Sequence, residues 1–285
     1  MLHRGSIAAM ALAAALAAVI TDAQAWDDTR YPDLKGEWVR GYPGLARFDP
    51  AKGLGPRQEA PLTAEYQAIY QANLAEQASG GQGIDPTYRC LSPGMPRVMH
   101  VYSPMEIVVT PDTTYLLIEH IHDSRRIYTD GRDWPENMYD DPQFSGYSIG
   151  KWVDEDGGGR YNALVVETRG LKNPRTYDAT GIPFHADGRT IIKEKFYLDK
   201  SNPNALYDDI TVIDNALTRP WSALKTYRRV AAKGPIWWRE DICAENNVHV
   251  VVGKEEYFLS ADGLLMPARK DQAPPDLRYF KQPGK

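Results

Sequence analysis

The sequence predicts a mainly β protein, a single antiparallel up-and-down β-barrel with one flanking N-terminal helix. Beyond Gly83, short β segments alternate with turn residues such as Pro111-Asp112 and Gly157-Gly158-Gly159. Nothing between these segments resembles the repeated crossover helices of a parallel sheet. One helical pattern precedes them. Closure of such a meander into a barrel removes its exposed strand edges.

The β segments follow one another at the spacing of an antiparallel meander. The expected strands are Glu106–Thr110, Thr114–His122, Arg126–Thr129, Ser148–Val153, Tyr161–Thr168, Ile191–Leu198, Leu206–Ile213 and Ala223–Val230, with one or two more around Val248–Val252 and Glu256–Leu259.

The helix is expected over about residues 63–79. Thr63 is a suitable N-cap, and the Gly80-Gly81 pair ends the pattern. Large apolar residues recur between them with helical spacing, at Tyr66, Ile69, Tyr70 and Leu74. We expect this helix to pack on the sheet or across a barrel mouth.

The first 25 residues have the organisation of a signal peptide. Arg4 precedes an apolar run, Ile7–Ile20, and Ala23-Gln24-Ala25 has the small-x-small pattern of a cleavage site. The run has about 14 residues, against the roughly 20 that a membrane-spanning helix needs. We therefore expect a signal peptide over 1–25, one barrel domain over 26–285, no membrane span, and a periplasmic or secreted location. An uncleaved N-terminal anchor is the alternative.

Composition restricts the partners of the chain. A net charge of −5 argues against nucleic acid, which usually requires a basic face. The sequence contains no phosphate-binding glycine loop, dinucleotide fingerprint or Gly-x-Ser-x-Gly elbow, so no cofactor is expected. The oligomeric state does not follow from the sequence.

The chain has two cysteines, Cys90 and Cys243. In an oxidising compartment a lone pair of cysteines usually forms a disulfide. The alternative is a thiol nucleophile or a metal ligand, but neither residue lies in a motif typical of those roles. We expect a disulfide.

Glu194 is the first candidate for chemistry. On the predicted strand Ile191–Leu198 it shares a face with Ile192 and Phe196. A carboxylate on the core face of a barrel strand is costly unless it is paired or reaches a wet cavity. Catalysis and a buried salt bridge to an arginine are both open interpretations.

His120 and His122 lie on one face of a predicted strand, about 7 Å apart, which is a usable spacing for metal ligands. A third ligand is not evident nearby in the sequence. We therefore assign no metal site and treat His120 as a substrate-binding candidate.

Two polar segments supply the other candidates. Arg126, Tyr128 and Arg132 flank an Asp-Gly turn and could hold a carboxylate or phenolate, or could cap a barrel end. Asp178 and His185 belong to a loop between strands, where they are candidates for general acid–base catalysis or for a turn and a solvated imidazole.

Tryptophans are frequent in the β region. Most are expected in the core, but a barrel lined by residues such as Trp152 and Trp221 would suit a flat apolar or phenolic ligand.

Several motifs between residues 90 and 246 resemble a large, mostly uncharacterised family of exported bacterial proteins, lipocalin-like (calycin-type) β-barrels. They are Cys90-x2-Pro93-Gly94-Met95-Pro96-Arg97, Arg125-Arg126-Ile127-Tyr128-Thr129-Asp130-Gly131-Arg132, Gly146-Tyr147-Ser148-Ile149-Gly150-Lys151-Trp152, Leu164-Val165-Val166-Glu167-Thr168, Asp178-x2-Gly181-x-Pro183, Thr218-x-Pro220-Trp221 and Cys243-x-Glu245-Asn246. The resemblance implies a lipocalin-like barrel and a Cys90–Cys243 bridge. It implies no particular activity.

The chain departs from that pattern at two positions. The family typically has Pro-His-Ser where Pro183-Phe184-His185 stands, and His where Tyr147 stands. A role carried over to His185 is weakened accordingly. One further match supports the resemblance, because Gly36-Glu37-Trp38 is similar to the Gly-x-Trp of a first lipocalin strand.

Two functional hypotheses follow. In the first, the barrel is a cofactor-independent lyase, isomerase or hydrolase for a small aromatic or hydrophobic compound. Glu194, His185 and Asp178 would then carry out acid–base chemistry, and Arg126, Tyr128 or Arg132 would stabilise an oxyanion. In the second, it is a non-catalytic lipocalin-like carrier of such a compound. An enzyme requires several ionisable groups that converge on the cavity, whereas a carrier needs one or two polar anchors.

Overall fold

The computed structural model describes most of the chain beyond the predicted signal peptide. The described residues are 27–41, 48–49, 52–53, 60–100, 104–120, 123–231, 237–240, 242–243, 248–253, 255–260 and 264–273. Residues 1–25 and His122 lie outside them.

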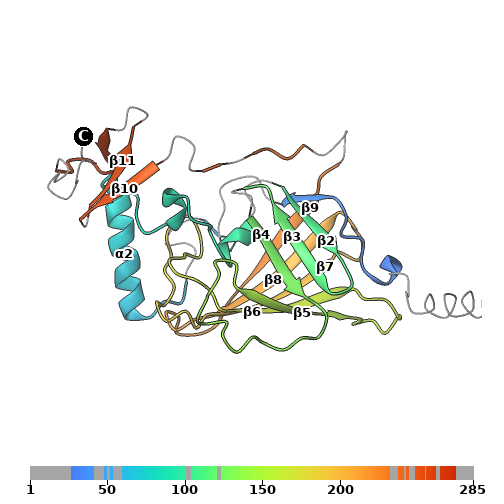
Figure 1. Cartoon of the computed structure of the whole chain (residues 1–285). Helices are drawn as coiled ribbons and strands as arrows, with labels where there is room; N and C mark the ends of the chain where they lie inside the picture. Colours follow the sequence, from blue (N-terminus) through green and yellow to red (C-terminus); the bar gives the residue numbers. More distant parts are fainter. Residues whose placement is uncertain are drawn as a thin grey trace, which may run out of the picture.

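Nine strands form a closed barrel, in general agreement with a lipocalin-like architecture (Figure 1). Each strand pairs with its neighbour in the sequence, and the first pairs with the last to close the ring. The strands are β1 (Glu37–Arg40), β2 (Met105–Val109), β3 (Thr113–Ile118), β4 (Asp123–Tyr128), β5 (Tyr147–Val153), β6 (Ala163–Arg169), β7 (Ile191–Leu198), β8 (Ala205–Ile213) and β9 (Trp221–Arg229).

The prediction of a purely antiparallel up-and-down barrel is wrong at one pair of strands. β4 and β5 run parallel, with Ile127 opposite Ser148 and Tyr128 opposite Ile149, so the sheet is mixed. A tight turn can join only antiparallel strands, and a parallel pair needs a long connection. Residues 129–146 provide one, because they return the chain to the end of the barrel at which β4 began.

Strand alternation directs one set of side chains into the barrel. β7 and β8 show it most clearly, since every second residue is buried along most of each strand. The apolar part of this interior is closely packed. It includes Trp38, Leu116, Ile127, Leu164, Ile192, Phe196, Leu206, Ile210 and Val212.

One end of the barrel is covered by α2 (Ala64–Ala78), close to the predicted span 63–79 (Figure 1). The Thr63 side chain caps its first turn by accepting a hydrogen bond from the Tyr66 N–H. Tyr70 and Asn73 are buried where they bond Thr180, in the connection between β6 and β7. The helix therefore packs on the connecting segments at this end of the barrel.

Residues 27–36 close the opposite end. They contain the 3-10 helix η1 (Asp28–Arg30), after which the Tyr31 ring contacts Trp152 edge-on at 5.2 Å. Two further 3-10 helices, η3 (Pro86–Arg89) and η4 (Arg97–His100), belong to the long connection from β1 to β2.

A three-stranded antiparallel sheet follows the barrel. Its strands are β10 (Val248–Val252), β11 (Glu255–Leu259) and β12 (Leu265–Pro267), and it lies beside α2 (Figure 1). The two strands expected around Val248–Val252 and Glu256–Leu259 are thus present, but they pair in this second sheet rather than in the barrel.

The predicted disulfide between Cys90 and Cys243 is confirmed, with Cα atoms 5.3 Å apart. It connects the segment after η3 to the chain that leads from β9 to the small sheet. Among the residues described, no helix is both long and apolar enough to span a membrane.

Gly181 determines how closely α2 approaches the β6–β7 connection. Its φ is +80°, and a Cβ atom there would lie 2.5 Å from Nδ2 of Asn73. We expect Gly181→Ala to lower the free energy of unfolding by about 2–3 kcal/mol, from backbone strain and from displacement of α2.

The matched control is Gly131→Ala. Gly131 has a similar φ of +82° but no atom within 4 Å of its Cβ position. Its replacement should therefore cost about 1 kcal/mol, from backbone strain alone. Urea denaturation measures both values, and equal losses would show that the contact with Asn73 contributes nothing.

Candidate functional site

Six polar side chains are buried together within the barrel and under its helix-covered end. We call them the lumen cluster: His100 from η4, Arg125 from β4, Glu194 from β7, Asp208 from β8, and Lys225 and Tyr227 from β9. None is more than 4% exposed. Charges at such depth are costly, so each requires a specific reason for its place.

Arg125 and Glu194 form the most completely bonded part of the lumen cluster. The guanidinium donates two hydrogen bonds to the carboxylate, one of them from Nη1 to Oε1 at 2.8 Å. It also donates to the hydroxyls of Ser148 at 3.2 Å and Thr168 at 2.8 Å. This bidentate geometry neutralises both charges and fixes the planes of both groups.

Asp208 and Lys225 are less well paired. They are directly opposite each other on β8 and β9, and both side chains are buried. Neither oxygen of the Asp208 carboxyl has a hydrogen-bond partner among the described residues. The Lys225 ammonium instead donates to the backbone carbonyl of Phe48 at 2.7 Å and lies 4.9 Å from the centre of its ring.

Burial moves the acid–base behaviour of this pair toward neutral pH. It lowers the pKa of Lys225 to about 8, although the negative charge of Asp208 opposes the shift. Burial also raises the pKa of Asp208 well above its ordinary value, and the nearby charge of Glu194 adds to this. Near neutral pH, the acid therefore holds its proton more tightly and the amine more loosely than either would in water.

His100 and Tyr227 complete the lumen cluster. Burial, with repulsion from Lys225, lowers the pKa of His100 well below its ordinary value, so the imidazole is neutral. Neither ring nitrogen makes a well-aligned hydrogen bond within the described residues. The Tyr227 hydroxyl donates to the backbone carbonyl of Met99 at 2.7 Å, and burial raises its pKa.

The two predicted catalytic residues of the β6–β7 connection are separated. Asp178 is fully buried and accepts hydrogen bonds from the backbone N–H and hydroxyl of Thr180, and burial raises its pKa. Its charge acts on Lys225, which places it near the lumen cluster. His185 is one-third exposed and pairs with Asp187 at 3.0 Å, beside the Tyr66 ring.

Arg126, Tyr128 and Arg132 lie on the outer wall rather than with Glu194. Alternation along β4 buries Arg125 and Ile127 and therefore turns their neighbours outward. The Arg132 guanidinium stacks 3.9 Å from the Tyr128 ring centre and pairs with Asp130. Arg126 is exposed and lines an outer groove of about 390 Å³.

His120 is half-buried just after β3, where its charge acts on Asp123. Within the described part of the chain, no three His, Cys, Asp or Glu side chains are grouped as metal ligands. Because His122 lies outside that part, the spacing of the two histidines is not tested.

Trp152 and Trp221, the two tryptophans predicted to contact a ligand, lie at opposite ends of the barrel. Trp152 packs against Tyr31 where residues 27–36 close one end. Trp221 begins β9 at the helix-covered end, 4.0 Å from Phe48 between ring centres, and Tyr177 contacts both rings. The second group forms an aromatic wall, and the centre of its Phe48 ring lies 4.9 Å from the Lys225 amine.

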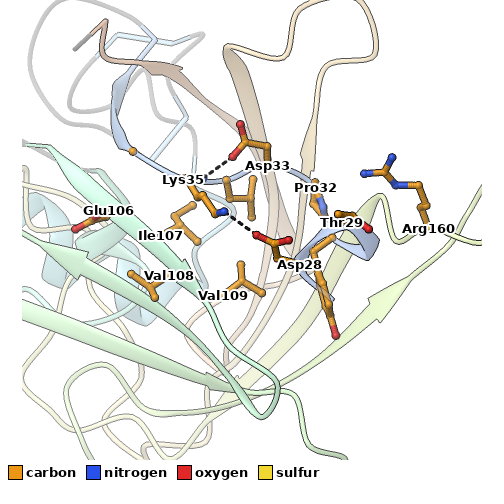
Figure 2. Close-up of a pocket in the computed structure, with 13 residues that line it drawn as sticks. Asp28, Thr29, Pro32, Asp33, Lys35, Glu106, Ile107, Val108, Val109 and Arg160 are labelled. Atoms are coloured by element: carbon orange, nitrogen blue, oxygen red, sulfur yellow. Dashed lines mark hydrogen bonds and ion pairs between the residues drawn. The ribbon is translucent and has the colours of Figure 1, made fainter. Parts of the chain in front are cut away.

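Figure 2 shows a larger groove of about 460 Å³ on the outside of the barrel. Residues 28–36 form one side of it and Glu106–Val109 of β2 the other. Lys35 pairs with Asp28 across its rim at 2.7 Å. No residue of the lumen cluster lines this groove, so it is separate from the candidate site.

Sequence reasoning identified Glu194 but missed its buried neighbours. The signal that found Glu194, a charge on the apolar face of a strand, is also present at Asp208, between Leu206 and Ile210, and at Lys225, between Ala223 and Tyr227. The same test applied to every strand would have identified both. Arg125 required the correct start of β4, which lies before the predicted Arg126.

Lys225→Met should stabilise the protein at neutral pH. The pKa of Lys225 falls from 10.5 in the unfolded chain to about 8 in the fold. The folded state therefore disfavours the charged amine, at a cost of about 3 kcal/mol that is fully present below pH 8. That cost declines as the pH rises from 8 to 10.5, because the folded protein then holds the neutral amine while the unfolded chain still binds a proton, and it vanishes above pH 10.5, where both states are neutral.

We therefore expect the variant to gain about 2–3 kcal/mol over wild type in urea denaturation at pH 7, and little at pH 10.5. Lys195→Met on the outer face of β7 is the control, with a change within about 0.5 kcal/mol at either pH. A gain for Lys225→Met that does not depend on pH would show that the buried charge is not its cause.

A search against protein-family models finds no match for this chain, and a search of curated proteins finds no significant similarity.

Proposed function

We propose that the protein is a cofactor-independent enzyme that converts a small aromatic or hydrophobic compound by acid–base chemistry within its barrel. The observation that carries this proposal is the Asp208–Lys225 pair, in which a buried carboxyl with no hydrogen bond from any described residue lies opposite a buried amine. A pair of groups whose pKa values are both displaced toward neutrality is typical of acid–base catalysis.

Asp208 would donate a proton and Lys225 would accept one. General acid–base catalysis is most effective when the pKa values of the two groups lie near the working pH. The lowered pKa of Lys225, about 8, meets that condition, and burial moves the pKa of Asp208 upward from its ordinary value. The neutral imidazole of His100 is a second acceptor in the same region.

Glu194 has a positioning role in this proposal. Its carboxylate is held by Arg125, and its charge contributes to the raised pKa of Asp208. The negative charge of Asp178 acts on Lys225 from the covered end of the barrel and opposes the lowering of its pKa. His185 pairs with Asp187 at the surface, so we assign it no proton transfer. The outer-wall residues take no part in the chemistry; they are Arg126, Tyr128 and Arg132.

The aromatic wall supports the ligand class. The centre of the Phe48 ring lies 4.9 Å from the Lys225 amine, and the ring contacts Tyr177 and Trp221. Tyr177 also stacks on Phe184, with ring centres 3.9 Å apart. Such a surface favours a flat apolar or phenolic molecule whose polar end faces the lumen cluster.

A carrier of the same compound is the second candidate. It is favoured by the complete bonding of Arg125 and Glu194, which leaves those two groups with a structural role. A single polar anchor such as Lys225 would then be sufficient to orient a ligand that is not changed.

We further propose that the chain belongs to the exported bacterial family that its motifs resemble and that residues 1–25 are its signal peptide. The Cys90–Cys243 disulfide supports an oxidising compartment. N-terminal sequencing of protein recovered from a bacterial periplasm should begin at Trp26, and a chain that begins at Met1 would contradict cleavage.

The function is tested in two steps. Native mass spectrometry of protein purified from a periplasm identifies any compound that copurifies, and small aromatic aldehydes, ketones, phenols and esters serve as probes if there is none. Turnover is then compared for wild type, Asp208→Asn and Asp209→Asn. Asp209 is the exposed neighbour of Asp208 on the same strand and provides the control.

An enzyme should convert the compound, and Asp208→Asn should lose about 10²–10⁴-fold in rate while Asp209→Asn keeps it. Recovery of the bound compound unchanged from excess wild-type protein would favour the carrier. Equal turnover by Asp208→Asn and wild type would contradict the assigned acid.

A further inference from the structure

Lys225 differs from the other lysines on the barrel strands. Lys193 and Lys195 project from the outer face of β7, where they lie near Glu167 and Glu155. Lys225 is 4% exposed, and among the described residues its hydrogen bond goes to a backbone carbonyl, that of Phe48. An amine so placed has no carboxylate within ion-pair distance in the described chain, although the carboxyl of Asp208 is opposite it in register.

We propose that Lys225 is a nucleophile that binds an aromatic carbonyl compound covalently as an imine, with Asp208 as the acid that assists loss of water. The inference names the substrate class of the site described above and therefore rests on the proposed function. It draws on the position of the two groups. They are a buried amine and a buried carboxyl that face the same part of the barrel, and within the described chain neither has an ion-pair partner at bonding distance.

Burial makes the amine of Lys225 more reactive as a nucleophile. Only the neutral form of an amine attacks a carbonyl carbon, and a desolvated lysine releases its proton more readily than one in water. The lowered pKa of Lys225, about 8, supports this, since desolvation outweighs the opposing negative charges of Asp208 and Asp178. Lysines on the outer wall have no comparable desolvation.

The step balances without an added reactant. The lone pair of Nζ attacks the carbonyl carbon, a C–N bond forms, and the carbonyl oxygen takes a proton to give a carbinolamine. Protonation of its hydroxyl by Asp208 and loss of a second proton from nitrogen break the C–O bond and release water. The net reaction is amine plus carbonyl to imine plus water, with no change of oxidation state.

Two features of the site define the carbonyl compound. The aromatic wall of Phe48, Tyr177 and Trp221 is suited to a flat ring beside the reacting carbon. Burial raises the pKa of Asp208 well above its ordinary value, which favours the protonated form that the dehydration step uses. Together they favour an aromatic aldehyde or ketone over an aliphatic acid or a sugar.

The experiment is reductive trapping. The full disulfide-bonded protein is incubated at pH 7 with benzaldehyde and sodium cyanoborohydride, which converts an imine into a stable benzylamine. Peptide mapping then measures labelling at Lys225 and at Lys195 in wild type, Asp208→Asn and Asp209→Asn. Circular dichroism of each variant verifies that it is folded.

We expect Lys225 to be labelled at least about tenfold faster than Lys195, because burial lowers the pKa of Lys225 to about 8 and so enlarges the neutral fraction of its amine at pH 7. Asp208→Asn should slow labelling of Lys225 about tenfold or more while labelling of Lys195 is unchanged, and Asp209→Asn should match wild type. Labelling of the outer lysines without Lys225, or equal labelling of both, overturns the proposal.

The experiments distinguish failure of the imine proposal from failure of the proposed enzyme function. Trapping at Lys225 with no turnover of any carbonyl probe would describe a covalent carrier, so the inference would stand and the proposed enzyme would fail. Turnover that depends on Asp208 with no trapping at Lys225 would leave the acid–base enzyme in place and remove the imine.

Discussion

Arg125→Met is expected to lower the free energy of unfolding by about 3–5 kcal/mol. The substitution leaves the carboxylate of Glu194, which is 2% exposed, without its positive partner inside the barrel. It also removes the donor that bonds Ser148 and Thr168. Urea denaturation at pH 7 measures the loss.

The double variant Arg125→Met/Glu194→Leu is the informative comparison. Replacement of both charges removes the cost of an unpaired buried carboxylate, and buried ion pairs are often exchanged for apolar residues at little net cost. We expect it to recover at least half of the loss. Arg126→Met, the exposed neighbour, should change stability by no more than about 0.5 kcal/mol. A double variant as unstable as Arg125→Met would show that the carboxylate was not the source of the loss.

The second large effect is expected from the disulfide. Cys90 and Cys243 are separated by 153 positions in the sequence, and closure of so long a loop restricts the unfolded chain. The chain-entropy account gives about 4–5 kcal/mol for a loop of this length. The variant Cys90→Ser/Cys243→Ser should lose about that amount of unfolding free energy relative to oxidised wild type.

Reduced wild-type protein is the control for the serine substitutions. If the stabilisation comes from restriction of the unfolded chain, wild type in a reducing agent and the double serine variant should have the same urea midpoint. An oxidised protein no more stable than the reduced one would mean that the bridge connects segments already held together by packing.

Local patterns were sufficient where an element depends on its own residues. The Thr63 cap and the spacing of Tyr66 and Tyr70 predicted α2 to within a residue at each end, because both signals act within a few turns of the chain. Alternation in Ile191–Leu198 predicted which face of β7 is buried, because the period of a strand is set by its backbone.

The direction of β5 could not be read in the same way. A segment such as Ser148–Val153 has the same alternation whether its neighbour runs parallel or antiparallel to it. The path of residues 129–146 across the barrel decides the pairing with β4, and that path depends on contacts between distant parts of the chain.

The same distinction between local and tertiary information applies to the candidate site. The sequence by itself determined that Glu194 lies on an apolar face, that two cysteines are available to form a bridge, and that one helix precedes a run of short strands, since each of these follows from near neighbours. Only the tertiary structure decided that Arg125 bonds Glu194, which lies 69 residues further along the chain, and that Asp208 is opposite Lys225 in the barrel. Closure of the barrel brings these groups together, and removal of water from its interior shifts the pKa values of Asp208 and Lys225, so neither effect is a property of a local segment.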